Sequence, residues 1–197
     1  MPKPSSDLVT MKDALGDLPI LDPFVRDIPE DEFRLLFPHY EERREQALKI
    51  SPCHFPPTHI YSNVYAMQHT PTGCSAFKNA DKYKPRKKNG QLVKGFGNTY
   101  KRQNWDTPSY TIAMSNNQIS TQNSVHPGHL IGKEEDGTEI FSDPRVLTIY
   151  ELMRLMTIPE DWSIPLTTNK QYLRHIIGEG VPSLLVKKIF ENISNAK

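Results

Sequence analysis

Four residues near the C-terminal end of the sequence, Gly178, Glu179, Gly180 and Val181, have the composition of a ligand-binding loop. Glycine lets a ligand come close to the backbone, and the amides at the N-terminus of a helix bind anions. Pro182 follows, and its fixed φ and missing N–H suit the first turn of a helix. Such loops usually lie in the first strand–helix unit of a nucleotide-binding domain. The sequence therefore predicts a binding loop, but the domain that usually carries one is not found ahead of it.

The two cysteines are the other reactive side chains. Cys53 lies in Ser-Pro-Cys-His (51–54), and we interpret both Cys53 and Cys74 as ordinary half-buried cysteines. Two cysteines do not make a disulfide framework. Cys53, His54 and His59 could bind a metal, but a fourth ligand and Cys-x-x-Cys spacing are missing. We therefore predict no metal site.

A basic block covers residues 78–102. Its members, with Asp81 as the only acid among them, are Lys78, Lys82, Lys84, Arg86, Lys87, Lys88, Lys94, Lys101 and Arg102. The aromatic residues Tyr83, Phe96, Tyr100 and Trp105 are interleaved with the block or follow it. This mixture is typical of a surface that contacts a phosphate backbone, and it predicts DNA affinity that falls as salt is raised. The alternative is a solvated, mobile loop.

The composition indicates a loop-rich protein. The 197 residues are 37% hydrophobic and 24% charged, with 17 prolines against 10 glycines, which favours irregular structure over a regular sandwich or bundle. The sequence has no run of about 18 apolar residues that could cross a membrane. Its N-terminus lacks the apolar stretch of a secretory signal. We therefore expect a cytoplasmic protein without a membrane partner.

Short helices are predicted in the first quarter of the chain. Thr10 and Asp13 have the spacing of a capping box, which indicates a helical turn. A second helix is predicted over 29–50, broken or bent at Pro38.

The middle of the chain favours short strands. Residues 60–67 and 109–115 have strand-like patterns. Within 126–142, Asp136-Gly137 is typical of the tight turn of a hairpin.

The last third is more regular. Thr148 and Glu151 have capping-box spacing and predict a helix that begins at Ile149, with one apolar face formed by Ile149, Leu152, Met153 and Met156. A helix is predicted over 169–177, ended by Gly178, and a final helix begins at Pro182.

Three passages, in this order, resemble the C-terminal part of cytosine-5 DNA methyltransferases. YKRQNWDTPSYTIAM (100–114) is similar to the end of the family's target recognition region, with Thr111-Ile112 as its Thr-Leu or Thr-Ile dipeptide. DPRVLTIYELMRLMTIPEDW (143–162) is similar to the ninth motif. IIGEGVPSLLVKKIF (176–190) is similar to the tenth, Gly-Asn-(Ala/Ser)-Val-Pro, with Glu179 in place of Asn. KDALGDLP (12–19) also resembles the segment that follows the eighth motif.

Other motifs of the family are missing from this sequence: the Phe-x-Gly-x-Gly cofactor loop, the Pro-Cys-Gln nucleophile loop, Glu-Asn-Val and the eighth motif. Because the chain has its own Met1 where the family's catalytic part would end, we expect one subunit of a split bacterial or phage enzyme. Its partner would be a second polypeptide carrying motifs one to eight. The alternatives are a C-terminal fragment or truncated gene, and a DNA-binding module without enzymatic role.

The resemblance implies an α+β fold. We expect a small irregular recognition domain with a short, mostly antiparallel sheet, followed by C-terminal helices that would complete the partner's α/β methyltransferase domain. The expected divisions are an N-terminal helical segment 1–50, a target recognition region 51–145, a ninth-motif helix 146–166, and a tenth-motif loop with a C-terminal helix 167–197.

The resemblance also implies roles for individual residues. S-adenosylmethionine would contact Gly178, Glu179, Gly180 and Val181 in a pocket shared with the partner. Double-stranded DNA would contact Thr111 and Ile112 at the flipped nucleotide, and further candidates for DNA binding are Lys87, Lys88, Lys101, Arg102, Asn116 and Gln118. For several of these, simple solvation or loop polarity is the alternative. A structural role is expected for Arg145, Thr148, Glu151 and Arg154, and no catalytic nucleophile is expected in this chain.

Overall fold

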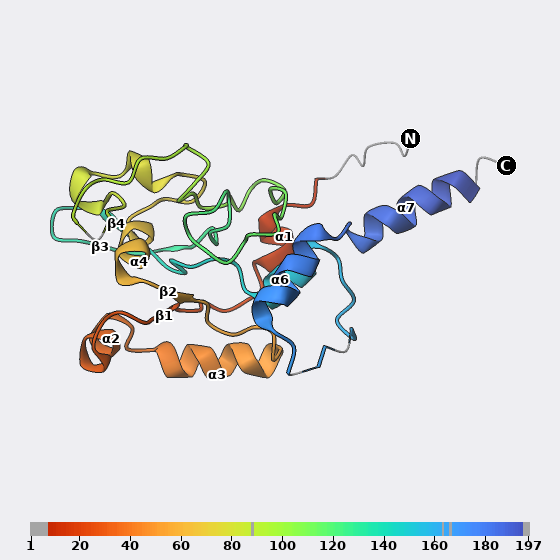
Figure 1. The fold of residues 1–197 in the computed structure, drawn as a ribbon, viewed down its shortest axis with the longest axis horizontal. Coiled ribbons are helices and arrows are strands. Elements are labelled where there is room, and N and C mark those ends of the chain that lie inside the picture. Colours follow the sequence, from red (N-terminus) through yellow and green to blue (C-terminus); the bar gives the residue numbers. More distant parts are fainter. Residues whose placement is uncertain (1–7, 88, 163, 166, 195–197) are drawn as a thin grey trace.

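The computed structural model describes residues 8–87, 89–162, 164–165 and 167–194. Within them the chain has an α+β fold of short elements (Figure 1). The helices are α1 Met11–Leu15, α2 Glu30–Leu36, α3 Tyr40–Ile50, α4 Tyr61–Gln68, α5 Ile149–Leu155, α6 Lys170–Glu179 and α7 Ser183–Ser194, with 3-10 helices η1 Ala76–Lys78 and η2 Asp81–Tyr83. The strands are β1 Phe24–Val25, β2 Thr58–His59, β3 Leu130–Lys133 and β4 Glu139–Phe141.

The strands form two separate two-stranded sheets. β3 and β4 are antiparallel, with Lys133 opposite Glu139, and Gly137 has a φ of +83° in the turn between them. This confirms the predicted hairpin. β1 and β2 are parallel, with Phe24 opposite Thr58. Within the described residues, four of the five isolated bridges are antiparallel like the hairpin, so the pairing is mostly antiparallel as expected, but it forms no single sheet.

The local helix signals are largely confirmed. Both capping boxes form, because each threonine hydroxyl accepts from the third amide while the third side chain accepts from the threonine amide. The predicted helix over 29–50 is two helices, α2 and α3, separated around Pro38.

Two predicted strands are wrong. Residues 61–68 form α4, which packs Val64, Ala66 and Met67 into the core, so tertiary packing overrides strand propensity there. Residues 109–115 form no strand. The Tyr110 amide donates to the Gln103 side chain and the Ala113 carbonyl accepts from the Asn116 side chain, rather than pairing with a neighbouring strand.

Two hydrophobic clusters hold the elements together. The first lies around α2 and α4 and includes Phe33, Phe37, Val64, Met67 and Val146. The second joins α1, α5 and α6, and its buried members are Met11, Leu15, Leu147, Ile149, Leu152, Met153, Met156, Leu173 and Ile177. The start of the chain and the predicted ninth-motif helix therefore share one core.

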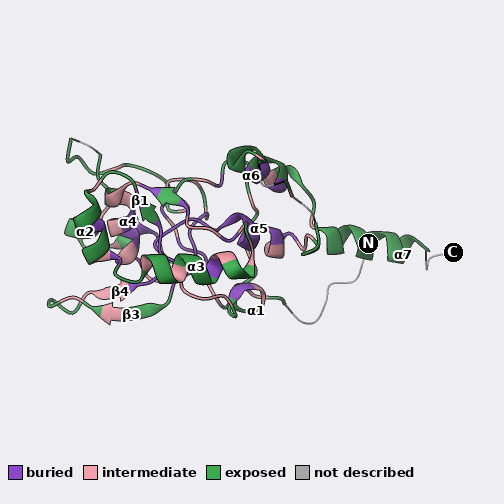
Figure 2. Ribbon diagram, turned by 90° about the horizontal axis from the view of Figure 1, so that it is seen from below, coloured by how far each residue is buried: buried purple, intermediate pink, exposed green. Residues whose placement is uncertain are grey.

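The final helix stands apart from both clusters. α7 projects from the body of the molecule (Figure 1), and it buries none of its described residues (Figure 2). None of the described helices has both the length and the apolar character needed to cross a membrane.

Candidate functional site

The predicted DNA-contact dipeptide lies on an irregular segment that packs against α6. Thr111 is exposed, whereas Ile112 is half-buried and packs on the second hydrophobic cluster. The Tyr110 amide donates to Gln103 Oε1 at 3.1 Å, which fixes the start of the segment. The hydroxyl of Thr111 is therefore presented to solvent on a held backbone.

Asn116 fixes the other end of this segment by hydrogen bonds, and its buried side chain does not reach the surface where DNA would bind. It is buried, and its Nδ2 donates to the carbonyls of Ala113 at 2.8 Å and Arg174 at 3.3 Å. Arg174 donates back to Asn116 Oδ1 at 2.9 Å and to the Leu147 carbonyl at 2.6 Å. The expectation that Asn116 reads a base edge is therefore wrong, whereas Gln118 is exposed and stays a prediction.

Arg102 corrects a second expectation. Its side chain is 0% exposed. Its guanidinium donates to the carbonyls of Met67, His126, Ser142 and Asp143. Burial lowers the pKa of Arg102 to about 9, although nearby Asp143 favours its charged form. Arg102 therefore ties loops together inside the protein and cannot contact a phosphate or guanine.

Some members of the basic block are paired within the chain and others face solvent. Lys82 pairs with Asp136 at 2.6 Å, Lys84 pairs with Asp81 at 2.7 Å, and Arg86 donates to the carbonyls of Gly90 and Asp81. Within the described residues, no ion pair is found for the exposed Lys78, Lys87 and Lys94. Lys101 is half-buried and donates to the Tyr110 hydroxyl at 3.1 Å. Lys88 lies outside the described residues.

A buried charge cluster positions the start of α5. Arg145 is fully buried and bridges two carboxylates, with Nη2 at 2.8 Å from both Asp143 Oδ1 and Glu151 Oε1. Its Nε donates to the Leu21 carbonyl at 2.9 Å, which ties in the chain ahead of β1. Glu151 also caps Thr148. Burial opposes ionisation of Glu151, but Arg145 outweighs it and holds the pKa of Glu151 far below its ordinary value. Arg154, by contrast, pairs with Asp17 near the surface. These contacts place the ninth-motif residues in structural positions.

Asp143 is a member of this buried charge cluster that the sequence analysis does not predict. It pairs with Arg145, accepts from the Leu21 amide at 3.0 Å and has a φ of +49°. The signal that could have indicated it is an acidic residue two positions before Arg145 in the ninth-motif passage.

His126 lies inside the same cluster and predicts a pH dependence of stability. Its Nδ1 accepts from the Gly128 amide at 3.1 Å, and burial lowers its pKa to about 4. Between pH 6.5 and 4 the unfolded chain therefore binds a proton that the folded chain does not, so the free energy of unfolding falls as pH is lowered. We expect the free energy of unfolding to fall by about 1–3 kcal/mol between pH 7 and pH 4. Urea unfolding at each pH measures this, and His126→Gln should make the profile less steep, because the buried His54 and His59, whose pKa values burial also lowers, still contribute. A wild-type profile that is flat over this range would contradict the assignment.

The predicted cofactor loop is shorter than expected. Gly178 and Glu179 belong to α6, and Gly180 ends the helix by donating its amide to the carbonyls of Ile176 and Ile177. The predicted end at Gly178 is wrong because α6 packs there directly on the recognition segment. A Cβ on Gly178 would lie 2.5 Å from the Ala113 carbonyl oxygen. Gly178 therefore packs α6 closely on the recognition segment, and its contact with a cofactor stays a prediction.

The start of α7 is also already occupied by the chain's own atoms. The Ser183 amide donates to the Met156 carbonyl at 3.1 Å, and the Leu184 amide donates to Thr157 Oγ1 at 3.0 Å. These amides are therefore not free to bind a ligand, contrary to expectation. What the loop presents to solvent is the carboxylate of Glu179, 3.4 Å from His175, and the apolar side chain of Val181.

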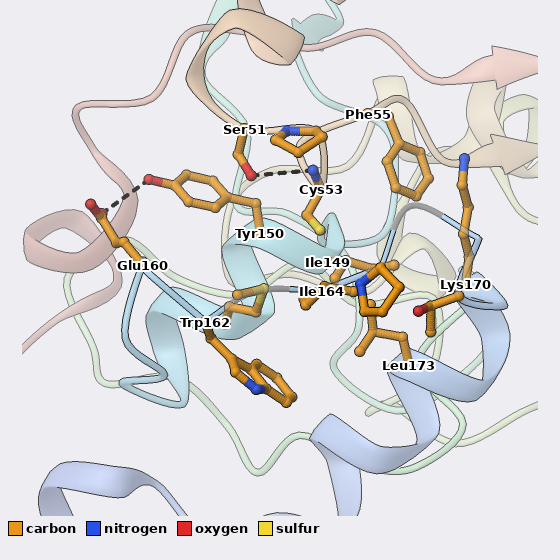
Figure 3. A pocket seen from close by; sticks show the side chains of 14 residues that line it. Ser51, Cys53, Phe55, Ile149, Tyr150, Glu160, Trp162, Ile164, Lys170 and Leu173 are labelled. Carbon is orange, nitrogen blue, oxygen red and sulfur yellow. Dashed lines mark hydrogen bonds between the residues drawn. The ribbon is translucent and has the colours of Figure 1, made fainter.

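Cys53 lines a hydrophobic pocket in the structure. A cavity of about 150 Å³ lies between α5, the start of α6 and residues 51–55 (Figure 3). Cys53 lines it beside Tyr150, whose hydroxyl donates to Glu160 at 3.2 Å, and Lys170, which stacks over the Phe55 ring. Burial raises the pKa of the Cys53 thiol.

Cys53 is therefore expected to alkylate slowly. Because its raised pKa leaves less thiolate at pH 8, iodoacetamide should modify it several times more slowly than it modifies glutathione. The rate is measured by intact-mass spectrometry on the Cys74→Ser variant. Modification as fast as that of glutathione would mean that the thiol is activated.

Comparisons with known proteins agree with the resemblance. The family model of C-5 cytosine-specific DNA methylases matches residues 22–195. The chain is 44% identical over 158 residues to the Type II methyltransferase M1.HgaI of Avibacterium volantium, a match that covers 80% of this chain and 42% of the relative. The chain thus spans less than half the length of this relative. No solved structure matches. With most of its length matched by the family model, the chain belongs to the C-5 cytosine-specific DNA methylases.

Proposed function

We propose that this chain is the DNA-recognition and cofactor-pocket-completing subunit of a DNA cytosine-5 methyltransferase. A second polypeptide carrying the Pro-Cys-Gln loop would supply the nucleophile. The observation that supports this most directly is α7, an amphipathic helix that follows the tenth-motif loop and buries none of its described residues. Its exposed apolar side chains are Leu184, Leu185, Val186, Ile189, Phe190 and Ile193. Such a face needs a covering surface, which the catalytic half would provide.

In the family's reaction, a thiolate adds to C6 of an extruded cytosine, and C5 then becomes the nucleophile. S-adenosylmethionine supplies the methyl group. A base within a duplex cannot be reached, so the opened DNA must be held during the reaction. This chain would hold it through Thr111 and the recognition loops, since a threonine hydroxyl can bond a phosphate without reading sequence.

The exposed groups at the C-terminal end of α6 and in the loop that follows fit a cofactor with ammonium and hydroxyl donors. The Glu179 carboxylate could accept hydrogen bonds from those donors, Val181 could pack against an apolar part, and Gly180 leaves room for approach. The carboxylate of Glu179 would repel the carboxylate of S-adenosylmethionine. Glu179 would therefore face the ammonium group or the ribose hydroxyls of the cofactor, with the cofactor's carboxylate turned away.

The test is reconstitution. The chain is mixed with a candidate partner that carries Pro-Cys-Gln, DNA and S-adenosylmethionine with a labelled methyl group. We expect methyl transfer from the mixture and none from this chain alone. Transfer by the lone chain would refute the division of labour, and so would full activity of the partner alone. Cys53→Ser in the mixture should leave the rate unchanged.

A further inference from the structure

Phe96 is an apolar side chain that the fold leaves in solvent. At 79% exposed, it is not exceeded by any other aromatic residue of the described chain. A single exposed apolar residue is common on protein surfaces, so its exposure alone decides nothing. A binding role also requires that the backbone which carries Phe96 be fixed in one conformation.

The backbone under Phe96 is fixed in a tight turn. The amide and the hydroxyl of Thr99 both donate to the Phe96 carbonyl, each at 2.9 Å. A Cβ on Gly95 would lie 2.9 Å from Phe77 Cζ, so the loop is in close contact with the Phe77 ring. Phe77 in turn packs edge-on against the buried Tyr100 ring, with centroids 5.6 Å apart. The turn is therefore anchored on the core while the Phe96 ring remains outside.

The surroundings of the turn suit DNA. The Asn98 carbonyl accepts from the Asn123 amide at 2.9 Å, and Thr99 pairs with Gln122 in an antiparallel bridge. The turn therefore lies against the loop that carries the exposed Gln118 and Gln122. The exposed Lys94 precedes Phe96 by two residues, and the exposed Lys87 lies earlier in the same basic block.

We propose that Phe96 is a wedge that stacks on the bases of double-stranded DNA where the duplex is opened or kinked. Proteins that distort DNA insert apolar side chains between base steps, and an aromatic ring stacks on any base without reading its identity. The neighbouring lysines would hold the phosphates while the ring enters the stack. This inference rests on the proposed DNA-recognition role.

The experiment measures binding of the full chain to two fluorescein-labelled 20-bp duplexes, one fully paired and one with a central mismatch, by anisotropy at several salt concentrations. The wild type should prefer the mismatched duplex, because unpaired bases are easier to unstack. Phe96→Ala should lose this preference and bind the mismatched duplex about 5- to 100-fold more weakly than the wild type does. Phe96→Trp should keep the preference and the wild-type affinity. The slope of log affinity against log salt should stay as in the wild type, since no phosphate contact is removed.

The matched control is Leu35→Ala. Leu35 is 83% exposed on α2, at the bottom of Figure 1, whereas the yellow-green segment that includes residues 85–100 runs along the top. This variant should bind as the wild type does. If Phe96→Ala keeps the wild-type affinity and mismatch preference, or loses no more than Leu35→Ala, the wedge is overturned while the DNA-recognition role stands. If the wild-type chain binds neither duplex at low salt, the recognition role fails and the wedge with it.

Discussion

Arg145→Met is expected to destabilise the chain by about 3–5 kcal/mol, the range for removing one partner of a buried ion pair. The methionine fills much of the volume but leaves the carboxylates of Asp143 and Glu151 without the cation that each contacts at 2.8 Å. It also removes the bond to the Leu21 carbonyl. Urea unfolding followed by circular dichroism measures the loss.

The control for this prediction comes from the same motif. Arg154 pairs with Asp17 at 2.9 Å, but that pair lies near the surface, so Arg154→Met should cost less than about 1 kcal/mol. If Arg145→Met does not fold, Arg145→Lys serves instead, because lysine keeps the charge but cannot bridge two carboxylates in the same way. Equal losses for Arg145→Met and Arg154→Met would show that the buried cluster does not organise the fold.

Gly178→Ala is expected to destabilise the chain although helix propensity alone favours alanine by about 1 kcal/mol. The new Cβ would lie 2.5 Å from the Ala113 carbonyl oxygen and 2.7 Å from Met114 Cα. Both atoms are backbone, so α6 or the recognition segment must move, at about 1–3 kcal/mol. In the reconstituted enzyme, such a shift of Thr111 should lower methyl transfer roughly 100-fold.

Gly180→Ala separates packing from ligand contact. A Cβ on Gly180 would come no closer than 3.3 Å to another atom, and its φ of −70° suits any residue. Thermal unfolding should therefore be unchanged, while a lower affinity for S-adenosylmethionine would support the proposed cofactor loop. A stable Gly178→Ala variant with full activity would contradict the packing role.

Local signals predicted the elements better than they predicted the site. The capping boxes at Thr10 and Thr148 and the turn at Asp136-Gly137 each depend on residues within a few positions, and all three formed. The tenth-motif loop begins two residues later than the sequence predicts, and the packing of Gly178 on Ala113 at this point joins segments far apart in the sequence.

The burial of two polar residues could not be predicted from local sequence either. Arg102 and Asn116 stand in polar, loop-like sequence, where solvent exposure is the natural expectation. Their partners are carbonyls of Met67, Ser142 and Arg174, and no spacing rule relates a side chain to a distant carbonyl. Only the folded chain brings these groups together and removes the side chains from solvent.

The core shared by α1, α5 and α6 has a consequence for synthesis. Met11 and Leu15 are made long before other members of the same cluster, such as Leu152 and Ile177. Until then α1 has only a few of its final neighbours and must wait as an exposed apolar turn. The second cluster can therefore close only after the chain has been made as far as Ile177, so α1 is the last of the early elements to be packed.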